Sequence, residues 1–318
     1  MDYRQLGRSG LNVSPLCLGG NVFGWTADER TSFAILDAWV EAGFNFIDTA
    51  DVYSRWAPGH QGGESETVIG RWLKQGGRRD KVVLASKVGF DMGEGRGGLS
   101  PRWIVQAVHD SLKRLQTDHI DLYQAHKDDF DTPLEETLEA FSKLIQAGKV
   151  RAIGASNYGA DRLKQALAVS QRLGLPRYES LQPLYNLYDR SGFEADLRAL
   201  CLEEDVGVIS FYALAAGFLS GKYRSAEDAS KSPRGANTVK KYLNERGLKI
   251  LAALDEAAQR TGQPASRVAI AWVMAQPGIT APIASASTTA QLHELVQASV
   301  LKLDRETMAL LDGASAGA

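Results

Sequence analysis

The chain has 318 residues, 44% of them hydrophobic and 23% charged, a composition typical of a folded globular protein and too apolar for a disordered one. Its 36 basic and 38 acidic residues give a net charge of −2, which argues against a strongly cationic nucleic-acid binder and against a polybasic membrane-surface protein. Two cysteines, no apolar signal core at the start and no apolar run long enough to span a bilayer lead us to expect a cytoplasmic protein without a disulfide framework.

Short apolar runs rich in β-branched residues alternate along the chain with longer segments of helical periodicity. A stretch with glycine and asparagine at residues 7–12 predicts a hairpin turn. The strand candidates that follow it are residues 16–18, 44–47, 82–85, 120–123, 150–153, 179–181, 206–209 and 279–283. This alternation indicates successive βα units and a parallel sheet.

Two of the intervening helices carry clear start signals. Ser100-Pro101 supplies an N-cap and a proline in the first turn, and Thr132-Pro133 repeats the pattern. Gly148 stands where the second of these helices is expected to end. The first helix is predicted to bury one apolar stripe, made of Ile104, Val105, Val108, Leu112 and Leu115.

Eight strand candidates, each followed by a helix and with no linker between them, predict a single (β/α)₈ barrel. The whole chain, residues 1–318, is interpreted as one domain with a short N-terminal β-hairpin. An open, doubly wound sheet is the alternative. The polar stretch from about Ser225 to Asn244 is interpreted as a long loop with a weak helix.

Polar side chains stand at the predicted carboxyl ends of these strands. Asp48, Lys87 and His126 follow one another at intervals of 39 residues, which suits one βα unit each. In a parallel barrel the carboxyl ends of the strands line the active site. We therefore expect these side chains to converge with those that end the later strands, Ser156-Asn157, Gln182, Phe211 and Ser285.

Tyr53, five residues after Asp48, completes a set that can transfer a proton. A free tyrosine titrates near about pH 10, too high for an efficient acid at neutral pH. We expect the Lys87 ammonium to lower the pKa of Tyr53 and Asp48 to pair with Lys87. His126 can orient the reacting oxygen by a hydrogen bond. No serine or cysteine has a recognisable nucleophile setting, which argues against hydrolysis through a covalent intermediate.

Taken singly, each residue has an ordinary structural interpretation. Asp48 suits a helix cap, Lys87 a surface lysine and His126 a hydrogen-bonded core histidine. Their joint placement at successive strand ends favours the functional interpretation. The remaining histidines, at positions 60, 109, 119 and 293, show no metal-ligand spacing, so no metal site is expected.

Two glycine-rich stretches imitate nucleotide-binding motifs. Gly93 to Gly98 matches G-x-G-x-x-G, but the predicted strand ends before it and the helix starts after it, so it is interpreted as a loop over the site. Gly217 to Lys222 is one residue shorter than a P-loop, and Tyr223 replaces the Ser/Thr that would hold Mg²⁺. Its glycines and lysine can still lie against a pyrophosphate.

The sequence resembles the aldo-keto reductases over nearly its whole length. Residues 45–53 (NFIDTADVY), 85–87 (ASK) and 121–126 (DLYQAH) resemble the family's three catalytic segments. Residues 154–157 and 182–186 resemble its nicotinamide-carboxamide segments, and 210–223 the segment that stacks on the nicotinamide and covers the pyrophosphate. The resemblance implies a (β/α)₈ barrel that binds NADP(H), with Tyr53 as the general acid of a tetrad completed by Asp48, Lys87 and His126.

The resemblance also implies contacts to the cofactor and the substrate. The expected cofactor residues are Gly20, Asn21, Val22, Asp48, Ser156, Asn157, Gln182, Phe211, Tyr212, Ala213, Leu214, Gly217, Leu219, Ser220, Lys222, Ser285, Ser287, Gln291 and Glu294. The expected substrate residues are Trp25, Tyr53, Trp56, Phe90 and His126. Phe211 stands where the family usually has Tyr or Trp, and any aromatic face can stack.

One departure from the family pattern bears on the choice of cofactor. The segment after the last strand usually carries Lys or Arg for the adenosine 2′-phosphate, whereas residues 284–291 contain no basic residue. Hydroxyl groups can bind a phosphate, but without the charge-assisted part of the interaction. NADP(H) remains favoured, NAD(H) is the alternative, and Arg224 or another loop residue is a candidate substitute cation.

The resulting expectation is an oxidoreductase that reversibly reduces an aldehyde or ketone to the alcohol, with a small molecule as partner and neither nucleic acid nor membrane. Its oligomeric state stays open. One alternative is a redox-sensing, cofactor-binding regulatory subunit, since some proteins of this fold serve channels as β-subunits. The lack of a long N-terminal extension argues against it. Another is an aldolase-like barrel in which Lys87 forms a Schiff base.

Overall fold

The computed structural model describes residues 2–317 and contains a two-stranded antiparallel hairpin and a sheet of eight parallel strands. The strands of the large sheet lie in the order β10-β3-β4-β5-β6-β7-β8-β9. Their bounds, with those of the hairpin, are β1 (Arg4–Gln5), β2 (Asn12–Val13), β3 (Cys17–Gly19), β4 (Phe46–Asp48), β5 (Val83–Val88), β6 (Ile120–Ala125), β7 (Val150–Ser156), β8 (Tyr178–Gln182), β9 (Gly207–Val208) and β10 (Ile283–Ala284).

The two edges of this sheet meet, so the sheet closes into a barrel. Val208 in β9 forms a parallel bridge with Ile279, and its carbonyl oxygen accepts the N–H of Thr280 at 2.9 Å. Ile283 in β10 donates its N–H to the carbonyl oxygen of Ser210 at 2.7 Å. The predicted (β/α)₈ barrel with its N-terminal hairpin is therefore confirmed, and the open sheet is excluded.

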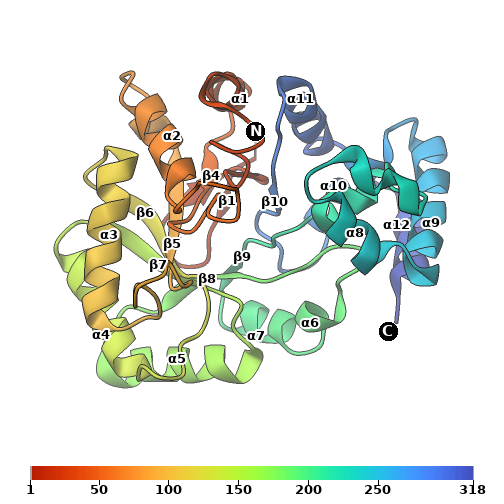
Figure 1. Ribbon diagram of the computed structural model, residues 1–318. Helices are drawn as coiled ribbons and strands as arrows, with labels where there is room; N and C mark the ends of the chain where they lie inside the picture. Colours follow the sequence, from red (N-terminus) through yellow and green to blue (C-terminus); the bar gives the residue numbers. More distant parts are fainter. Residues whose placement is uncertain (1, 318) are drawn as a thin grey trace.

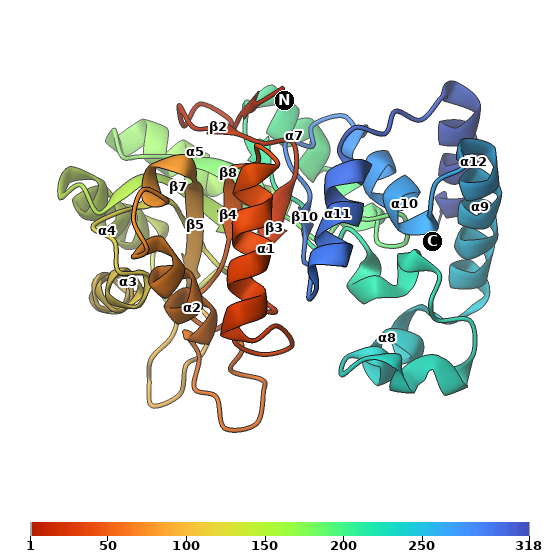
Figure 2. The ribbon, with the colours of Figure 1, turned by 90° about the horizontal axis from the view of Figure 1, so that it is seen from above.

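Helices surround the strands (Figure 1). The α-helices are α1 (Glu29–Glu41), α2 (Glu64–Leu73), α3 (Pro101–Leu115), α4 (Leu134–Gln146), α5 (Ala160–Leu173), α6 (Ser191–Glu194), α7 (Leu197–Glu203), α8 (Gly235–Tyr242), α9 (Glu245–Thr261), α10 (Ala265–Met274), α11 (Thr289–Ala298) and α12 (Arg305–Ser315). Three 3₁₀ segments accompany them, η1 (Arg79–Lys81), η2 (Ala215–Ser220) and η3 (Ala226–Lys231). Figure 2 shows the hairpin at one end of the barrel and α8 at the other.

An apolar layer fills the barrel interior. Successive residues of a strand point to opposite faces, so every second side chain enters the barrel. The inward-facing apolar residues are Cys17, Phe46, Ala85, Leu122, Ala152, Ile209 and Ile283. Leu6, Leu11 and Val13 of the hairpin region join the same cluster and cover the amino-terminal ends of the strands. Two residues further along several strands, the same inner face carries the polar residues of the candidate site.

Gly7 lets the hairpin approach the barrel closely. Its φ is +53°, and a Cβ atom at this position would lie 2.3 Å from the carbonyl oxygen of Glu179. Only glycine satisfies both the left-handed backbone and the lack of space.

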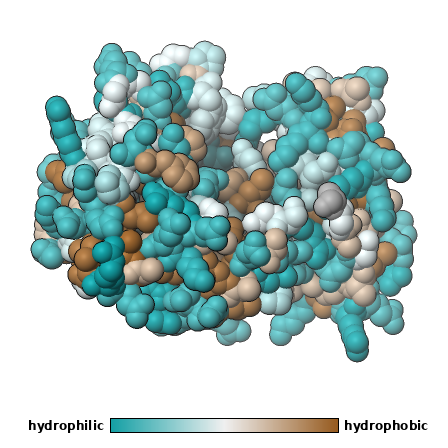
Figure 3. All heavy atoms as spheres, turned by 90° about the horizontal axis from the view of Figure 1, so that it is seen from below, coloured by the Kyte–Doolittle hydropathy of each residue, from teal (hydrophilic) through white to brown (hydrophobic). Residues whose placement is uncertain are grey.

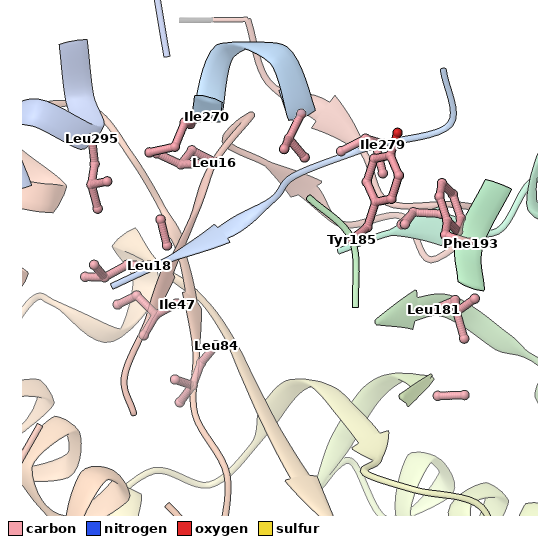
Figure 4. Packing of buried hydrophobic residues seen from close by; sticks show 14 of the residues in the cluster. Leu16, Leu18, Ile47, Leu84, Leu181, Tyr185, Phe193, Ile270, Ile279 and Leu295 are labelled. Carbon is pink, nitrogen blue, oxygen red and sulfur yellow. The ribbon is translucent and has the colours of Figure 1, made fainter. Parts of the chain in front are cut away.

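A second apolar layer lies between the barrel and the helices. Leu18, Ile47 and Leu84 are in register on neighbouring strands and point outward together (Figure 4). Trp39 of α1 and Trp72 of α2 are fully buried in the same layer. Burial of such side chains contributes about 1.5–3 kcal/mol each.

The strands of the barrel are uneven in length. β5, β6 and β7 have 6, 6 and 7 residues, whereas β9 and β10 have 2 each. The side of the barrel formed by β5 to β7 therefore carries most of the regular ladder. The side formed by β9 and β10 is held by few strand hydrogen bonds.

The helix starts agree only partly with the predictions. Ser100 caps α3 by accepting the N–H of Trp103, as predicted. Thr132 does not cap α4, because its hydroxyl donates to Asp129 Oδ2 at 2.8 Å and Pro133 occupies the N-cap position. Val105 is exposed rather than part of the buried stripe of α3.

Residues 225–244 are more ordered than the predicted long loop, since they form η3 and α8. The capping box of Ser225 and Asp228 starts η3. Tyr242 at the end of α8 is buried, stacks on Phe218 and donates to Asp189 Oδ2 at 2.8 Å. These contacts join residues far apart in the sequence, so local composition gave no sign of them.

Hydrophilic side chains predominate on the face seen from below, with hydrophobic residues in separate places among them (Figure 3). Such a mixed surface is usual for folded proteins. Between residues 2 and 317, none of the helices combines the length and the apolar character that a membrane crossing requires.

Candidate functional site

The polar strand ends meet at the carboxyl-terminal mouth of the barrel around a cavity of about 700 Å³. Ligand pockets usually measure about 300–1,000 Å³. The sequence-predicted residues that line the cavity are Asn21, Val22, Tyr53, Trp56, Phe90, His126, Ser156, Asn157, Gln182, Phe211, Tyr212, Ala213, Leu214, Gly217, Ser220, Lys222, Ser285, Ser287, Gln291 and Glu294. Those outside its lining are Gly20, Trp25, Asp48, Lys87 and Leu219.

Lys87 lies beneath the cavity with no exposed surface. Its Nζ atom donates to Asp48 Oδ2 at 2.6 Å, to the Thr49 carbonyl oxygen at 2.8 Å and to the Tyr53 hydroxyl oxygen at 2.8 Å. All three N–H bonds of an ammonium group are thus used. A Schiff base requires a free, neutral amine, so this geometry argues against the aldolase-like alternative.

Asp48 joins four strands of the barrel at this point. Its Oδ1 atom accepts the side-chain amides of Gln124 at 3.1 Å and Gln182 at 3.0 Å. Its Oδ2 atom accepts the Lys87 ammonium and the Tyr53 hydroxyl, the latter at 3.2 Å. Sequence reasoning missed Gln124, although strand alternation indicates it, because it lies two residues after the inward-facing Leu122.

The pKa of Tyr53 departs from the sequence-based expectation. Burial raises it well above the usual value, and the negative charge of Asp48, which accepts the phenol O–H, raises it further. Lys87 was expected to lower it, but both larger effects favour the protonated phenol. Tyr53 therefore carries its proton throughout the neutral range, as an acid must.

His126 lies beside Tyr53 and is 7% exposed. Burial and the charge of Lys87 lower its pKa well below the usual value. The imidazole is therefore neutral at pH 7 and has one N–H to donate. Phe90 packs against the ring at a centroid distance of 4.3 Å and holds its plane.

Ser156, Asn157 and Gln182 form one wall of the cavity with hydroxyl and amide groups. The Ser156 hydroxyl donates to the carbonyl oxygen of Gln182 at 2.9 Å, and Asn157 Nδ2 donates to that of His126 at 2.9 Å. Asn157 has a φ of +58°, a left-handed conformation that asparagine tolerates better than most residues. The wall is thus fixed by bonds to the neighbouring strand ends.

The segment after β9 crosses the cavity with an unusual backbone. Tyr212 and Ala216 have φ values of +58° and +56°, and Gly217 follows at +91°. A Cβ atom on Gly217 would lie 3.3 Å from Lys222 Nζ, so the lysine head lies close to this backbone. Consecutive left-handed and right-handed residues form concave backbone sites for anions, and Lys222 adds a positive charge.

The region after β10 forms the opposite end of the cavity. Ser285 bonds to Asn21 Oδ1 at 2.5 Å, and Ser287 Oγ lies 3.2 Å from Thr26 Oγ1. Glu294 of α11 is paired with Arg267, with Nε–Oε2 at 2.8 Å. This pairing offsets the negative charge at that end of the cavity.

Cations reach the cavity from a segment that sequence reasoning did not assign to it. Lys231 and Arg234 line the cavity together with Lys222. Arg224, the substitute cation proposed from the sequence, instead pairs with Asp255 of α9 at 2.6 Å and does not line the cavity. Lys231 ends η3 and Arg234 follows it, and the folding of this segment was not predicted.

Aromatic side chains form the outer part of the cavity wall. Trp56 is 49% exposed and packs edge-on against Tyr53 at 5.9 Å and Trp25 at 5.7 Å. Trp25 lies behind Trp56 and also carries the Arg234 guanidinium over its ring at 5.5 Å. Trp25 therefore supports the wall from behind.

The donor groups in the cavity fit a nicotinamide dinucleotide. Amides suit a carboxamide, the Phe211 ring suits a flat heterocycle, and the 212–217 backbone with Lys222 suits a pyrophosphate. Residues 93–98, the Rossmann-like decoy, form an irregular segment between β5 and α3 and do not line the cavity. Within residues 2–317, no cluster of three or more His, Cys, Asp or Glu side chains is placed to hold a metal ion.

Fold and site together define a (β/α)₈ barrel whose carboxyl-terminal mouth holds the hydrogen-bonded side chains of Lys87, Asp48 and Tyr53. A family model described as the aldo/keto reductase family matches residues 15–316. The chain therefore belongs to the aldo/keto reductase family and is an oxidoreductase that acts on small molecules with a nicotinamide cofactor.

Individual relatives are similar over almost their whole length. An uncharacterized oxidoreductase, YrpG, of Bacillus subtilis is 37% identical over 98% of this chain and 95% of its own. A probable voltage-gated potassium channel subunit beta of Oryza sativa is 33% identical over 94% of this chain and 91% of its own. An L-glyceraldehyde 3-phosphate reductase of Escherichia coli O157:H7 is 32% identical over 98% of this chain and 92% of its own.

Proposed function

We propose that the protein reversibly reduces an aldehyde or ketone to the alcohol with NADP(H), using Tyr53 as the general acid. The observation that carries the proposal is the Tyr53 hydroxyl, held by Lys87 and Asp48 and lining a cavity of about 700 Å³ beside His126. The bound nicotinamide supplies a hydride to the carbonyl carbon or takes one from the alcohol.

The side chains around the cavity bind the cofactor, orient the substrate and transfer the proton. Ser156, Asn157 and Gln182 hold the carboxamide and thereby fix which face of the ring meets the substrate. His126 donates a hydrogen bond to the carbonyl oxygen and orients it. Tyr53 gives its proton to that oxygen, and solvent later restores it.

Lys87 and Asp48 act on the phenolate that this transfer leaves. The Lys87 ammonium already donates to the phenol oxygen at 2.8 Å, so it meets the new negative charge without moving. Asp48 holds the Lys87 ammonium in position by accepting its hydrogen bond at 2.6 Å. A general acid of this kind accelerates a reaction by about 10²–10⁴-fold.

The substitution Tyr53→Phe tests this role. It removes the acid while keeping the ring that packs on Trp56, so turnover should fall by about 10²–10⁴-fold. NADPH binding, measured by quenching of tryptophan fluorescence, should stay unchanged. A variant that retains most of its turnover would refute Tyr53 as the acid.

NADP(H) is preferred to NAD(H) in this proposal because Lys222, Lys231 and Arg234 line the cavity. Residues 284–291 lack a cation for the 2′-phosphate, so Arg234 is the substitute we propose. Arg234→Met should lower the NADPH:NADH ratio of kcat/KM about tenfold or more. Arg224→Met is the matched control, since Arg224 pairs with Asp255 outside the cavity. An unchanged ratio in Arg234→Met would refute Arg234 as the residue that binds the 2′-phosphate, and a ratio below one in the unmodified protein would make NAD(H) the better assignment.

The similarity to a channel β-subunit is comparable to the similarity to a reductase, so the comparisons do not favour the regulatory alternative. Steady turnover of NADPH with a panel of aldehydes, ketones and sugars supports the enzyme. Tight NADPH binding without turnover across that panel would support the regulatory subunit.

A further inference from the structure

A cluster of buried charged side chains lies behind the segment that carries Tyr53, and the proposed reaction does not use it. Asp51 is 2% exposed, and Glu66 of α2 is completely buried. Arg114 of α3 donates from Nε to Glu66 Oε2 at 2.7 Å, and the Ser86 hydroxyl donates to the other oxygen. Ser86 precedes Lys87 on β5, so the two side chains point to opposite faces of the strand.

Asp51 connects this cluster to the site. Its backbone N–H donates to the carbonyl oxygen of Lys87 at 3.3 Å, which ties the segment between Asp48 and Tyr53 to β5. Both oxygens of its carboxyl group are buried, no side chain donates to them, and the only nearby donor among the described residues is the backbone N–H of Val52. A buried carboxylate with so few donors is unfavourable, whereas a neutral carboxylic acid is tolerated.

Charged and titratable groups face Asp51 from every element packed around it. Glu66 comes from α2, Arg114 from α3, Lys87 from β5 and the Tyr123 hydroxyl from β6, while Asp110 of α3 acts on Arg114 and Tyr123. Burial and then the charge of Glu66 raise the pKa of Asp51 to about 8, against the smaller opposing effects of Arg114, the Val52 backbone N–H and Lys87. Asp51 is therefore mostly protonated at neutral pH.

The packing around the cluster leaves little room for adjustment. A Cβ atom on Gly62 would lie 3.0 Å from the Asp51 carbonyl oxygen, and one on Gly70 would lie 2.1 Å from that of Arg114. The loop before α2 thus packs directly against the Asp51 backbone, and α2 packs directly against α3. The Arg114 guanidinium attracts an ionised Asp51 and the buried Glu66 carboxylate repels it, and a movement of Asp51 toward Arg114 moves the backbone two residues before Tyr53.

We propose that Asp51 is a positioning residue: as an uncharged group packed against the Glu66–Arg114 pair it holds residues 49–53 against Lys87, and loss of its proton displaces Tyr53 and lowers turnover. This inference rests on the proposed function, because Tyr53 is the group it positions. The effect is distinct from ionisation of Tyr53 itself, whose pKa lies far higher.

The pH dependence of kcat/KM tests the proposal, with NADPH and para-nitrobenzaldehyde as probes. In the unmodified protein kcat/KM should fall as the pH rises through about 8, the pKa of Asp51. At about pH 9 only about one-tenth of the molecules keep the proton, so the fall should be about tenfold. Asp51→Asn is permanently neutral and nearly isosteric, so it should keep the neutral-pH activity and lose this inflection.

Two further variants make the test specific. Asp128→Asn is the matched control, since Asp128 lies on another loop of the same mouth and pairs with Arg162 at 2.9 Å. This variant should keep the fall of kcat/KM near pH 8. Glu66→Gln removes the charge that raises the pKa of Asp51, so the inflection should move to lower pH. This variant decides the question if Asp51→Asn fails to fold. An inflection that persists in Asp51→Asn, or stays in place in Glu66→Gln, would overturn the proposal.

Tryptophan fluorescence of the cofactor-free protein separates this inference from the proposed function. Trp56 follows Tyr53 by three residues, so displacement of the segment should change its emission over the same pH range. The change should be absent in Asp51→Asn. If no carbonyl compound is reduced but the fluorescence change depends on Asp51, the proposed function fails and the displacement stands; if the change is independent of Asp51, the positioning role fails.

Discussion

The two ends of the barrel each contain a buried aspartate with several hydrogen-bond donors, yet only one end has the features of a reaction site. At the amino-terminal end Asp121 is 1% exposed and bonds Arg79 at 2.8 Å, Arg151 at 2.9 Å and the N–H of Leu84 at 2.8 Å. At the mouth, the partners of Asp48 include Tyr53, which lines the cavity. A buried ion pair alone therefore does not identify a reaction site. Asp48 differs from Asp121 because one of its partners, Tyr53, lines an open cavity.

The surroundings of the two aspartates explain this contrast. Asp121 precedes the inward-facing Leu122, so its side chain points out of the barrel, toward Arg79 of η1. The hairpin closes the amino-terminal end of the interior, where Leu6 and Val13 are completely buried. At the mouth, the loops after β4, β5 and β9 leave an opening. This division agrees with the general rule that the carboxyl-terminal face of such barrels carries the chemistry.

The largest difference between the ends should appear when one cation is removed from each. Lys87→Met leaves Asp48 and Tyr53 without their ammonium, so turnover should fall by about 10³-fold or more, and the unpaired carboxylate should lower the free energy of unfolding by about 3–5 kcal/mol. Arg79→Met should cost about 1–3 kcal/mol, since Asp121 keeps Arg151 and Leu84.

Turnover per folded molecule should be unchanged in Arg79→Met. Urea unfolding and the NADPH-dependent rate of both variants provide the measurements. Equal losses of turnover in the two variants would show that the ion pair at the amino-terminal end also contributes to the reaction.

A pH-dependent difference in stability should mark Asp51. Its pKa is about 8 in the folded protein, and that of an aspartate in an unfolded chain is about 3.9. The folded state binds more protons in this window, so this group lowers the free energy of unfolding as the pH rises from about 4 to 8, with no further change above it.

Asp51→Asn should remove that decrease, worth up to about 5 kcal/mol over the window. Urea unfolding at a series of pH values measures it, and Asp128→Asn should keep the slope of the unmodified protein. If the free energy of unfolding changes with pH equally in all three proteins, the pKa of Asp51 is not raised in the folded protein.

The smallest expected effect is a purely structural change at the closed end. Gly7→Ala places a Cβ atom 2.3 Å from the Glu179 carbonyl oxygen at a φ of +53°, so the hairpin must shift. The free energy of unfolding should fall by about 1–3 kcal/mol, measured by thermal unfolding. The kcat and KM values should match those of the unmodified protein, and a loss of turnover would show that the closed end is coupled to the mouth.

Residue spacing was sufficient to predict the barrel and the convergence of its strand ends. Asp48, Lys87 and His126 could be brought together because βα units repeat at regular intervals and strand alternation fixes the inward face. Tyr53 lies in a loop, beyond the reach of alternation, so its nearness to Asp48 in the sequence made it a candidate and the family resemblance gave it the role of acid. The same alternation places Gln124 on the inward face, where it donates to Asp48.

The missed features depend on contacts between distant segments. Lys231 and Arg234 reach the cavity because η3 and α8 fold, and that folding depends on Tyr242 packing against Phe218. Thr132 has the sequence of a helix cap but bonds Asp129 instead. Such competition between local and tertiary partners cannot be judged from composition or spacing.

The uneven strand lengths have a consequence for local opening. The side of the barrel with β5 to β7 carries long ladders, whereas β9 and β10 have 2 residues each and border the segments that form the far wall of the cavity. Backbone amides of β5 to β7 should therefore exchange with deuterated solvent most slowly, and those around Val208 and Ile283 much faster. The far wall of the cavity should therefore open locally more often than the side of the barrel that carries Lys87.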